Sequence, residues 1–154
     1  MIDSVLVVCV GNICRSPVGA RVLSTYLAQT GGRIAVDSAG LNALEGEGAN
    51  DLAAEVAKAH VIDVGDHIAQ QFTPALGQKH NLILVMEPGH KREVARRAPE
   101  LSGRVMLFDQ WSGAQGIPDP YRRDRAFHER VFAQIDAAAR GWVPRIAPSG
   151  AMQP

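Results

Sequence analysis

The sequence predicts a three-layer α/β/α domain built on a four-stranded parallel sheet. Apolar, β-branched runs at residues 5–10, 82–86 and 105–108 have no polar alternation, as in strands that are buried on both faces. The segments between them carry apolar residues at helical spacing, and strands that alternate with helices favour a parallel sheet. The chain has 154 residues, of which 46% are hydrophobic, enough for one domain with a substantial core.

The first elements form a βαβ unit over residues 5–36. Gly11-Asn12 ends the first strand, and Ser16-Pro17 is typical of a helix start, with Ser16 as the expected N-cap. Val18, Val22, Leu23, Tyr26 and Leu27 then recur at helical spacing up to Gly31-Gly32. A second strand follows at residues 34–36, and its crossover from the first strand should be right-handed.

The second half of the chain repeats the alternation of helices and strands. We expect helices from Asn50 to about His60, from Thr73-Pro74, from Pro88 to Arg97 and from Asp124 to about Arg140, with strands at residues 82–86 and 105–108. A long loop rich in Gly, Pro and Asp spans residues 109–121. We therefore predict a single domain over residues 1–145 and a flexible C-terminal tail over residues 146–154.

Charge and composition exclude several classes of protein. Sixteen basic and sixteen acidic residues balance, which argues against a nucleic-acid or membrane-surface binder. The apolar run at residues 2–10 is too short to cross a bilayer and lacks the basic start of a signal peptide, so we expect no membrane insertion and a cytoplasmic protein. The two cysteines, Cys9 and Cys14, can build neither a disulfide framework nor a four-ligand zinc site.

Parallel sheets bind ligands beyond the carboxyl ends of their strands. Three segments should meet there: residues 9–16, 37–48 and 109–121. The first of them joins a buried strand to a helix N-terminus, which offers unpaired N–H donors and a positive dipole end. Gly11 and Asn12 tolerate unusual backbone angles, so the loop can turn its amides inward and form a phosphate-binding loop.

Two further side chains fit phosphate chemistry at this loop. Arg15 can clamp a phosphate in bidentate fashion, and Cys9 at the mouth of the loop is positioned to attack phosphorus. The alternative is that Cys9 is a small core residue in an ordinary turn. The other common phosphate cradle, the Walker loop, is absent from the sequence.

Asp119, in the long loop at the same sheet edge, can supply the proton that a leaving oxygen needs. A carboxyl that faces a bound phosphate dianion tends to keep its proton, which suits a general acid. Taken alone, an Asp before Pro is better explained as a turn residue.

Residues Cys9 to Ser16 together with Asp119-Pro120-Tyr121 resemble the low-molecular-weight protein tyrosine phosphatases. The resemblance covers about residues 3–143, and residues 81–127 are most similar to the bacterial branch that partners tyrosine kinases of exopolysaccharide or capsule export. It implies a hydrolase that cleaves phosphotyrosine through a cysteinyl-phosphate intermediate, with tyrosine-phosphorylated proteins, a tyrosine autokinase among them, as partners. No metal or organic cofactor is implied.

The resemblance also assigns roles to individual residues. Catalysis falls to Cys9 as nucleophile, Arg15 as phosphate clamp and Asp119 as general acid and then base. Ser16 bonds the thiolate, Asn12 supports the loop, and Asp37 and His67 brace it. The substrate-binding set is Val10, Gly11, Asn12, Ile13, Cys14, Ser16, Leu44 and Tyr121.

The sequence departs from animal members of the family at two positions. Leu44 stands where they carry an aromatic residue, and Arg122 stands where they carry a second tyrosine after the equivalent of Tyr121. The cleft is therefore expected to be less aromatic and more basic. Arg122 and Arg123 should favour acidic residues near the phosphotyrosine.

The sequence is consistent with two roles for Cys14. It is a buried space-filling residue, or it is a resolving thiol that traps oxidised Cys9 as a reversible disulfide, as the family suggests.

Two other functions use the same fold. An arsenate reductase needs two further cysteines downstream of the loop, and the sequence has none after Cys14. A non-catalytic phosphotyrosine-binding module is the second rival, against which the joint presence of Cys9, Arg15 and Asp119 argues.

Overall fold

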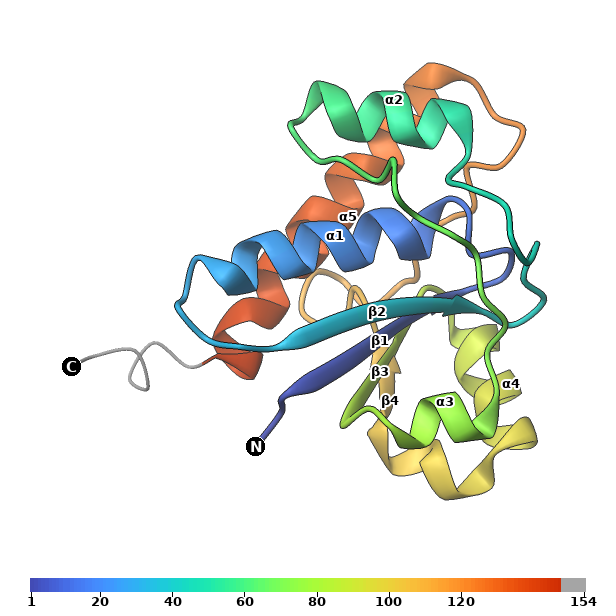
Figure 1. Cartoon of the computed structure of the whole chain (residues 1–154), viewed down its shortest axis with the longest axis vertical. Coiled ribbons are helices and arrows are strands. Elements are labelled where there is room, and N and C mark those ends of the chain that lie inside the picture. The colour runs from blue at the N-terminus through green and yellow to red at the C-terminus, as the bar shows by residue number, and fades with distance from the viewer. Residues whose placement is uncertain (148–154) are drawn as a thin grey trace.

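The computed structural model describes residues 1–147 and has four parallel strands in the order β2-β1-β3-β4 (Figure 1). The strands are β1 (Ser4–Cys9), β2 (Ala35–Gly40), β3 (Leu82–Val85) and β4 (Val105–Leu107). The helices are α1 (Arg15–Ala28), α2 (Asp51–Ala59), α3 (Pro74–Gln78), α4 (Pro88–Arg97) and α5 (Arg125–Ile146), with a 3-10 helix at Pro99–Arg104. Within residues 1–147, we find no helix with the length and apolar composition that crossing a bilayer requires.

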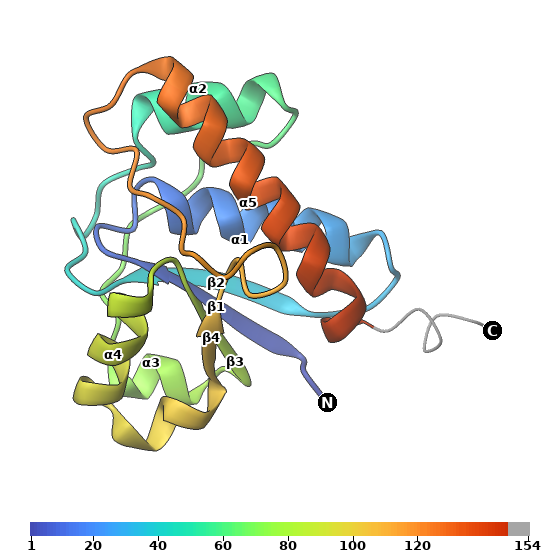
Figure 2. The same cartoon turned by 180° about the vertical axis from the view of Figure 1, so that it is seen from behind.

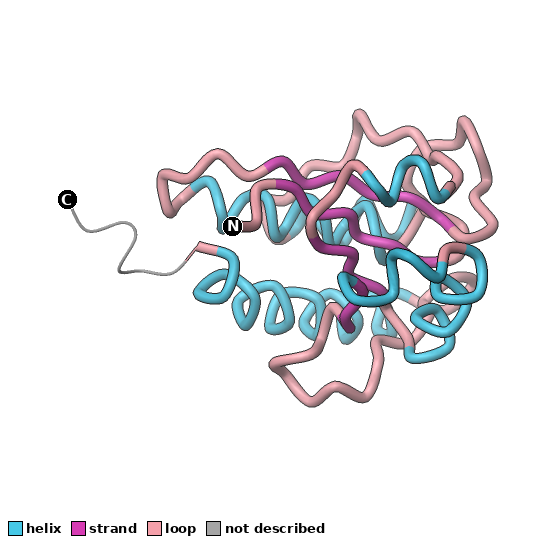
Figure 3. Tube along the Cα trace, turned by 90° about the horizontal axis from the view of Figure 1, so that it is seen from below, coloured by secondary structure: helices cyan, strands magenta, loops and turns pink. Residues whose placement is uncertain are grey.

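Alternate side chains of β1 enter two separate cores, as expected for a strand that is covered on both faces. Val5, Val7 and Cys9 belong to the core beneath α1 and α5, while Leu6 and Val8 belong to the core beneath α4 and the 3-10 helix. Figure 2 shows α1 and α5 on one side of the sheet and α3 and α4 on the other, and Figure 3 traces the strands between these layers. The predicted three-layer α/β/α architecture is confirmed.

The start of α1 differs from the prediction. The helix begins at Arg15, and Cys14 occupies the N-cap position without a side-chain cap. Ser16 cannot act as the cap because its hydroxyl lies against the Cys9 sulfur, at 2.9 Å, and accepts from Asn12 at 2.7 Å. The helix starts predicted at Asn50, Thr73 and Asp124 are confirmed, and each of these side chains caps its helix by accepting a backbone N–H.

The last helix is longer than predicted. It continues past Arg140 to Ile146 although it contains Pro144, and Ile146 and Ala147 are buried in the core. The packed domain therefore includes the first two residues of the expected tail. The rest of that predicted tail, residues 148–154, lies outside the described residues.

Candidate active site

The three segments that were expected to meet at the carboxyl ends of the strands do so. They enclose a cavity of about 210 Å³. Its lining combines the loop after β1, the loop after β2 and the long loop before α5: Cys9, Val10, Gly11, Ile13, Cys14, Arg15, Asn42, Leu44, Asp119 and Tyr121. Of the predicted site residues, only Asn12 and Ser16 do not line it; they lie behind the loop and are buried.

The loop after β1 turns its carbonyl groups away from the cavity. The carbonyls of Cys9, Val10 and Gly11 accept the N–H groups of Leu41, Asn42 and Leu44, and the Ile13 carbonyl accepts that of Asn50. The backbone N–H groups of residues 10–15 donate no hydrogen bond to other described residues. Because the C=O and N–H groups of one peptide unit point in opposite directions, the amides that follow these bonded carbonyls face the other side of the turn, an arrangement suited to binding an anion.

This close approach of two loops requires glycine at position 40. A Cβ atom built there would lie 2.4 Å from the Val10 carbonyl oxygen, a contact that no side chain tolerates. Gly40 ends β2, so the strand delivers its following loop directly against the phosphate-binding loop.

Asn12 holds the shape of the loop from behind. Its φ of 59° lies in the left-handed region, which costs energy for a residue with a side chain. Its side-chain amide donates to Ser16 and Ser38, and its Oδ1 accepts the Gln70 N–H at 2.9 Å. These bonds, all made by a fully buried side chain, offset the strain.

His67 and Asp37 support the loop after β1 in different ways. The His67 Nε2 lies 2.6 Å from the Asn12 carbonyl oxygen, so His67 contacts the loop directly. The Asp37 carboxylate instead accepts from the Gln70 side chain at 3.2 Å and from its neighbour Ser38. Asp37 therefore bonds to Gln70 and Ser38, the two residues that hold Asn12, and makes no hydrogen bond to residues 9–16 in the described structure.

Arg15 is 2% exposed, and its guanidinium both bonds to protein groups and lines the cavity. Its Nη1 donates to the Glu87 carboxylate and to the Ile117 carbonyl, the latter at 2.7 Å. Its Nη2 lies 3.8 Å from the Asp119 carboxylate, and its Nε has no partner among the described residues. A buried, unpartnered N–H beside a nest of free amides fits an anionic ligand such as phosphate.

Asp119 and Tyr121 lie across the cavity from the loop. The Asp119 side chain is about half exposed, and its Oδ1 accepts the Tyr121 N–H at 3.0 Å. This short turn holds the carboxyl group toward Arg15 and the phenol ring along the cavity wall. The arrangement places a carboxyl group and an aromatic ring on the wall of the same cavity as Cys9 and Arg15.

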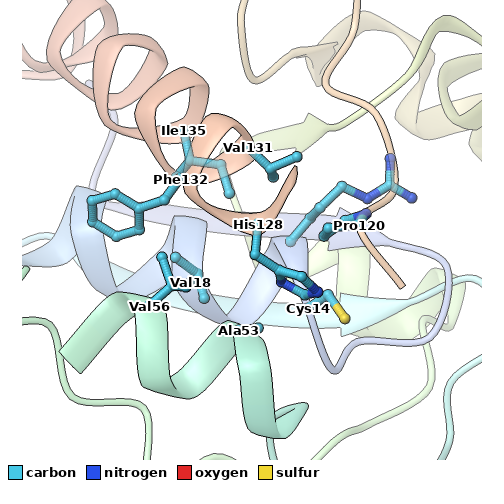
Figure 4. A pocket seen from close by; sticks show the side chains of 10 residues that line it. Cys14, Val18, Ala53, Val56, Pro120, His128, Val131, Phe132 and Ile135 are labelled. Atoms are coloured by element: carbon cyan, nitrogen blue, oxygen red, sulfur yellow. The ribbon is translucent and has the colours of Figure 1, made fainter. Parts of the chain in front are cut away.

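Behind the loop, Cys14 faces a nearly filled apolar space of about 10 Å³ between α1, α2 and α5 (Figure 4). Burial, reinforced by the nearby Cys9 and Asp119, raises the pKa of the Cys14 thiol to about 12. The Cys14 thiol is therefore protonated at physiological pH. Cys9 and Cys14 are both free, and they differ in surroundings: the Cys9 sulfur has the Ser16 hydroxyl as a polar neighbour.

Two side chains that bind Arg15 or line the cavity were not predicted. Glu87 binds Arg15 from the segment that follows β3, and Asn42 lines the cavity from the segment after β2. In a parallel sheet the segment after β3 reaches the same edge as the loops after β1 and β2. The position of Glu87 in the sequence could therefore have indicated that it lies near the site. Asn42 lies within the expected segment, but nothing in its own sequence context distinguishes it.

The comparisons with known proteins agree with this geometry. Residues 4–151 match the family model described as low molecular weight phosphotyrosine protein phosphatase. The chain is 43% identical over 142 residues to the low molecular weight protein-tyrosine-phosphatase Wzb of Salmonella typhimurium, which covers 92% of this chain and 93% of Wzb.

Two solved structures extend the match to the fold. The crystal structure of the tyrosine phosphatase AmsI of Erwinia amylovora superposes with a TM-score of 0.90 at 41% identity, covering 96% of this chain and 95% of AmsI. Wzb of Vibrio vulnificus, solved in complex with benzylphosphonate, gives a TM-score of 0.90 at 44% identity, covering 94% of this chain and 99% of that one. The chain thus belongs to the low molecular weight phosphotyrosine protein phosphatases.

Proposed function

We propose that this enzyme hydrolyses phosphotyrosine in proteins through a covalent phosphocysteine on Cys9. The observation that carries the proposal is the meeting, around one cavity, of a buried thiol, an unpartnered arginine N–H and a carboxyl group from residues far apart in the chain. The benzylphosphonate bound to Vibrio vulnificus Wzb is an aryl-bearing phosphonate, in keeping with an aromatic phosphoester as substrate.

The reaction divides into two displacements at phosphorus. In the first, the Cys9 thiolate attacks, an S–P bond forms, the P–O bond to the tyrosyl group breaks, and Asp119 gives its proton to the departing oxygen. In the second, the Asp119 carboxylate takes a proton from water, whose oxygen attacks phosphorus. The S–P bond then breaks, which releases phosphate and restores the Cys9 thiolate.

The other groups stabilise the charge on the transferred phosphoryl group. The amides of residues 10–15 and the free Nε and Nη2 of Arg15 bind its oxygens. Ser16 donates its hydroxyl hydrogen to the Cys9 sulfur, which favours the thiolate both before attack and as leaving group. Tyr121 and Leu44 form the walls against which the substrate ring lies.

For the cellular role, we propose a tyrosine-phosphorylated protein of exopolysaccharide production as substrate, with an autophosphorylating tyrosine kinase as partner. The basis is the similarity to Wzb and AmsI together with the motif resemblance. We place the enzyme in the cytoplasm, because the reaction needs Cys9 as a free thiol and reducing compartments keep it so.

The proposal is tested with purified protein and phosphopeptides. Phosphotyrosine should be hydrolysed and phosphoserine should not, because a cavity this deep is reached only by a long, flat side chain. Cys9→Ser should abolish turnover and still bind phosphate, whereas Arg15→Ala should lose both. Asp119→Asn should slow phenyl phosphate by roughly two to four orders of magnitude and p-nitrophenyl phosphate less.

Intact-mass analysis of Asp119→Asn during turnover should reveal one phosphoryl group on the chain, since this substitution also slows the second step. Substantial activity in Cys9→Ser would contradict a covalent intermediate. Binding of a phosphotyrosine peptide without turnover by the wild-type protein would favour the non-catalytic binding module.

A further inference from the structure

A group of arginines lies beside the cavity, where Tyr121 forms part of its wall. The guanidinium carbon of Arg122 lies 5.3 Å from the centre of the Tyr121 ring. Those of Arg123 and Arg130 lie 4.1 Å and 5.3 Å from the centre of the Phe127 ring. We call Arg122, Arg123 and Arg130 the arginine patch; all three side chains are exposed.

The backbone is built to bring these arginines together. The Arg123 N–H donates to the Pro120 carbonyl at 2.9 Å, which closes a turn, and Arg122 within that turn has a φ of 63°. The first turns of α5 then place Phe127 and Arg130 three residues apart on one helix face. A left-handed arginine costs energy, so the turn holds this side chain beside Tyr121 at the expense of local backbone strain.

The arginine patch has no anionic partner within residues 1–147. Its members take part in none of the ion pairs of the structure, whereas the neighbouring Arg125 pairs with Glu55 at 3.5 Å and with Glu129 at 3.9 Å. Two carboxylates lie between Arg122 and Arg130 in the sequence. Asp124 caps α5 by accepting the Phe127 N–H, and Glu129 pairs with Arg125 and lies 3.0 Å from the His60 Nε2. The three arginines of the patch therefore have no ion-pair partner among the described residues, while both carboxylates between them in the sequence have other partners.

Stacking on an aromatic ring prepares an arginine for an anion. It uses the flat face of the guanidinium and leaves the five N–H donors in its plane free to bind carboxylates. It also limits the motion of a long side chain, which lowers the entropy lost on binding.

We propose that the arginine patch binds acidic residues that flank the phosphotyrosine in a protein substrate, so that this enzyme selects phosphotyrosines in acidic segments. The inference rests on the proposed phosphatase function and adds a specificity determinant to it. Because Tyr121 both lines the cavity and carries Arg122, a peptide whose phosphotyrosine enters the cavity meets the patch at Arg122, and Arg123 follows Arg122 directly in the chain.

The test compares two phosphotyrosine peptides of equal length, one flanked by glutamates and the other by glutamines at the same positions. The readout is the ratio of their kcat/KM values, in which any general change in activity cancels. Wild type should prefer the glutamate peptide by roughly three- to tenfold at low salt, and 0.5 M salt should reduce this preference because exposed charges are screened.

The triple variant Arg122→Gln/Arg123→Gln/Arg130→Gln should bring the ratio close to one. The control is Arg33→Gln, which removes an equally exposed arginine just before β2, at the opposite edge of the sheet, and should keep the wild-type ratio. A ratio of one in wild type, or an unchanged ratio in the triple variant, would overturn the inference while leaving the phosphatase function intact. Failure to hydrolyse both peptides and p-nitrophenyl phosphate would overturn the proposed function and this inference with it.

Discussion

At the scale of single residues, the buried Arg15 shows how the site keeps a cation ready for its ligand. A buried charge needs partners, and the guanidinium obtains them at one end only, from Glu87 and the Ile117 carbonyl. Its Nε remains free toward the loop. Glu87 therefore sets the direction of the two donors that would hold phosphate.

Replacing Glu87 should weaken anion binding without touching the nucleophile. Glu87→Ala frees the Arg15 side chain, and we expect inorganic phosphate to inhibit roughly tenfold more weakly, since hydrogen bonds between charged groups contribute about 1.5–3 kcal/mol. Glu87→Gln, which keeps an acceptor, should lie between this variant and wild type. The matched control is Glu100→Ala in the 3-10 helix, where the inhibition constant should not change. Equal inhibition constants in all four proteins would show that Arg15 needs no such support.

The second residue-scale prediction concerns the two cysteines. Peroxide should inactivate the enzyme at Cys9, and Cys14 can then close a disulfide only through its thiolate. With a pKa of about 12, Cys14 is almost entirely protonated at neutral pH, and its thiolate fraction rises tenfold for each pH unit. Recovery of activity by dithiothreitol after a brief exposure should therefore increase from pH 7 to pH 9.

The matched control for the redox prediction is Cys14→Ser, which lacks the resolving thiol and should recover poorly at every pH. Intact mass separates the outcomes, because a disulfide removes two hydrogens and over-oxidation adds oxygens. Similar recovery in the two proteins would leave Cys14 as a packing residue only.

At the scale of elements, the sequence predicted those whose signal is local. The apolar runs of β1, β3 and β4 and the helix starts at Asn50, Thr73 and Asp124 were recognised because neighbouring residues alone determine them. The prediction for Ser16 as N-cap was wrong because its hydroxyl bonds with Cys9 and Asn12 within the loop and is not available to a backbone N–H of the helix. The C-terminal extension of α5 was missed because a proline inside a helix, here Pro144, is normally unfavourable. Burial of Ile146 in the core stabilises the last turn of the helix despite this proline.

A buried histidine in α5, His128, should lower the free energy of unfolding of the protein at acidic pH. Burial lowers the pKa of His128, although the Pro120 backbone, Asp119 and Asp124 act in the opposite direction. The unfolded chain therefore binds a proton at a higher pH than the folded one, and stability is lost as the pH falls below the ordinary histidine range. The pKa of the buried His90 is likewise lowered, by burial and by Arg15, so His90 contributes to the same dependence of stability on pH.

Removal of the His128 imidazole should flatten this dependence. In urea denaturation at pH 7.5 and 5.5, we expect the free energy of unfolding of wild type to fall by roughly 1 kcal/mol or less per buried histidine. The decrease should be smaller in His128→Gln, whatever that variant loses in absolute stability. Parallel pH curves for the two proteins would mean that His128 does not contribute to the slope.

At the scale of the whole molecule, topology explains why much of the site could be predicted. A parallel sheet sends the loops after its strands to one edge, so the convergence of residues 9–16, 37–48 and 109–121 followed from the order of the elements. The contacts of His67 with Asn12 and of Glu87 with Arg15 join positions 55 and 72 residues apart. No local pattern encodes such pairs, because they depend on how the layers pack.

Since the site unites segments from the whole chain, an anion bound there should stabilise the entire fold. A ligand that binds only the folded state at 100 times its Kd contributes about 2.7 kcal/mol, and for a domain of this size each kcal/mol raises Tm by about 2–4 °C. Saturating phosphate should thus raise the Tm of wild type by roughly 5–10 °C. Cys9→Ser should show a similar rise, because the amide nest and Arg15 remain, whereas Arg15→Ala should show little. A rise of the same size in Arg15→Ala would reveal a general salt effect and would remove the support for phosphate binding at this loop.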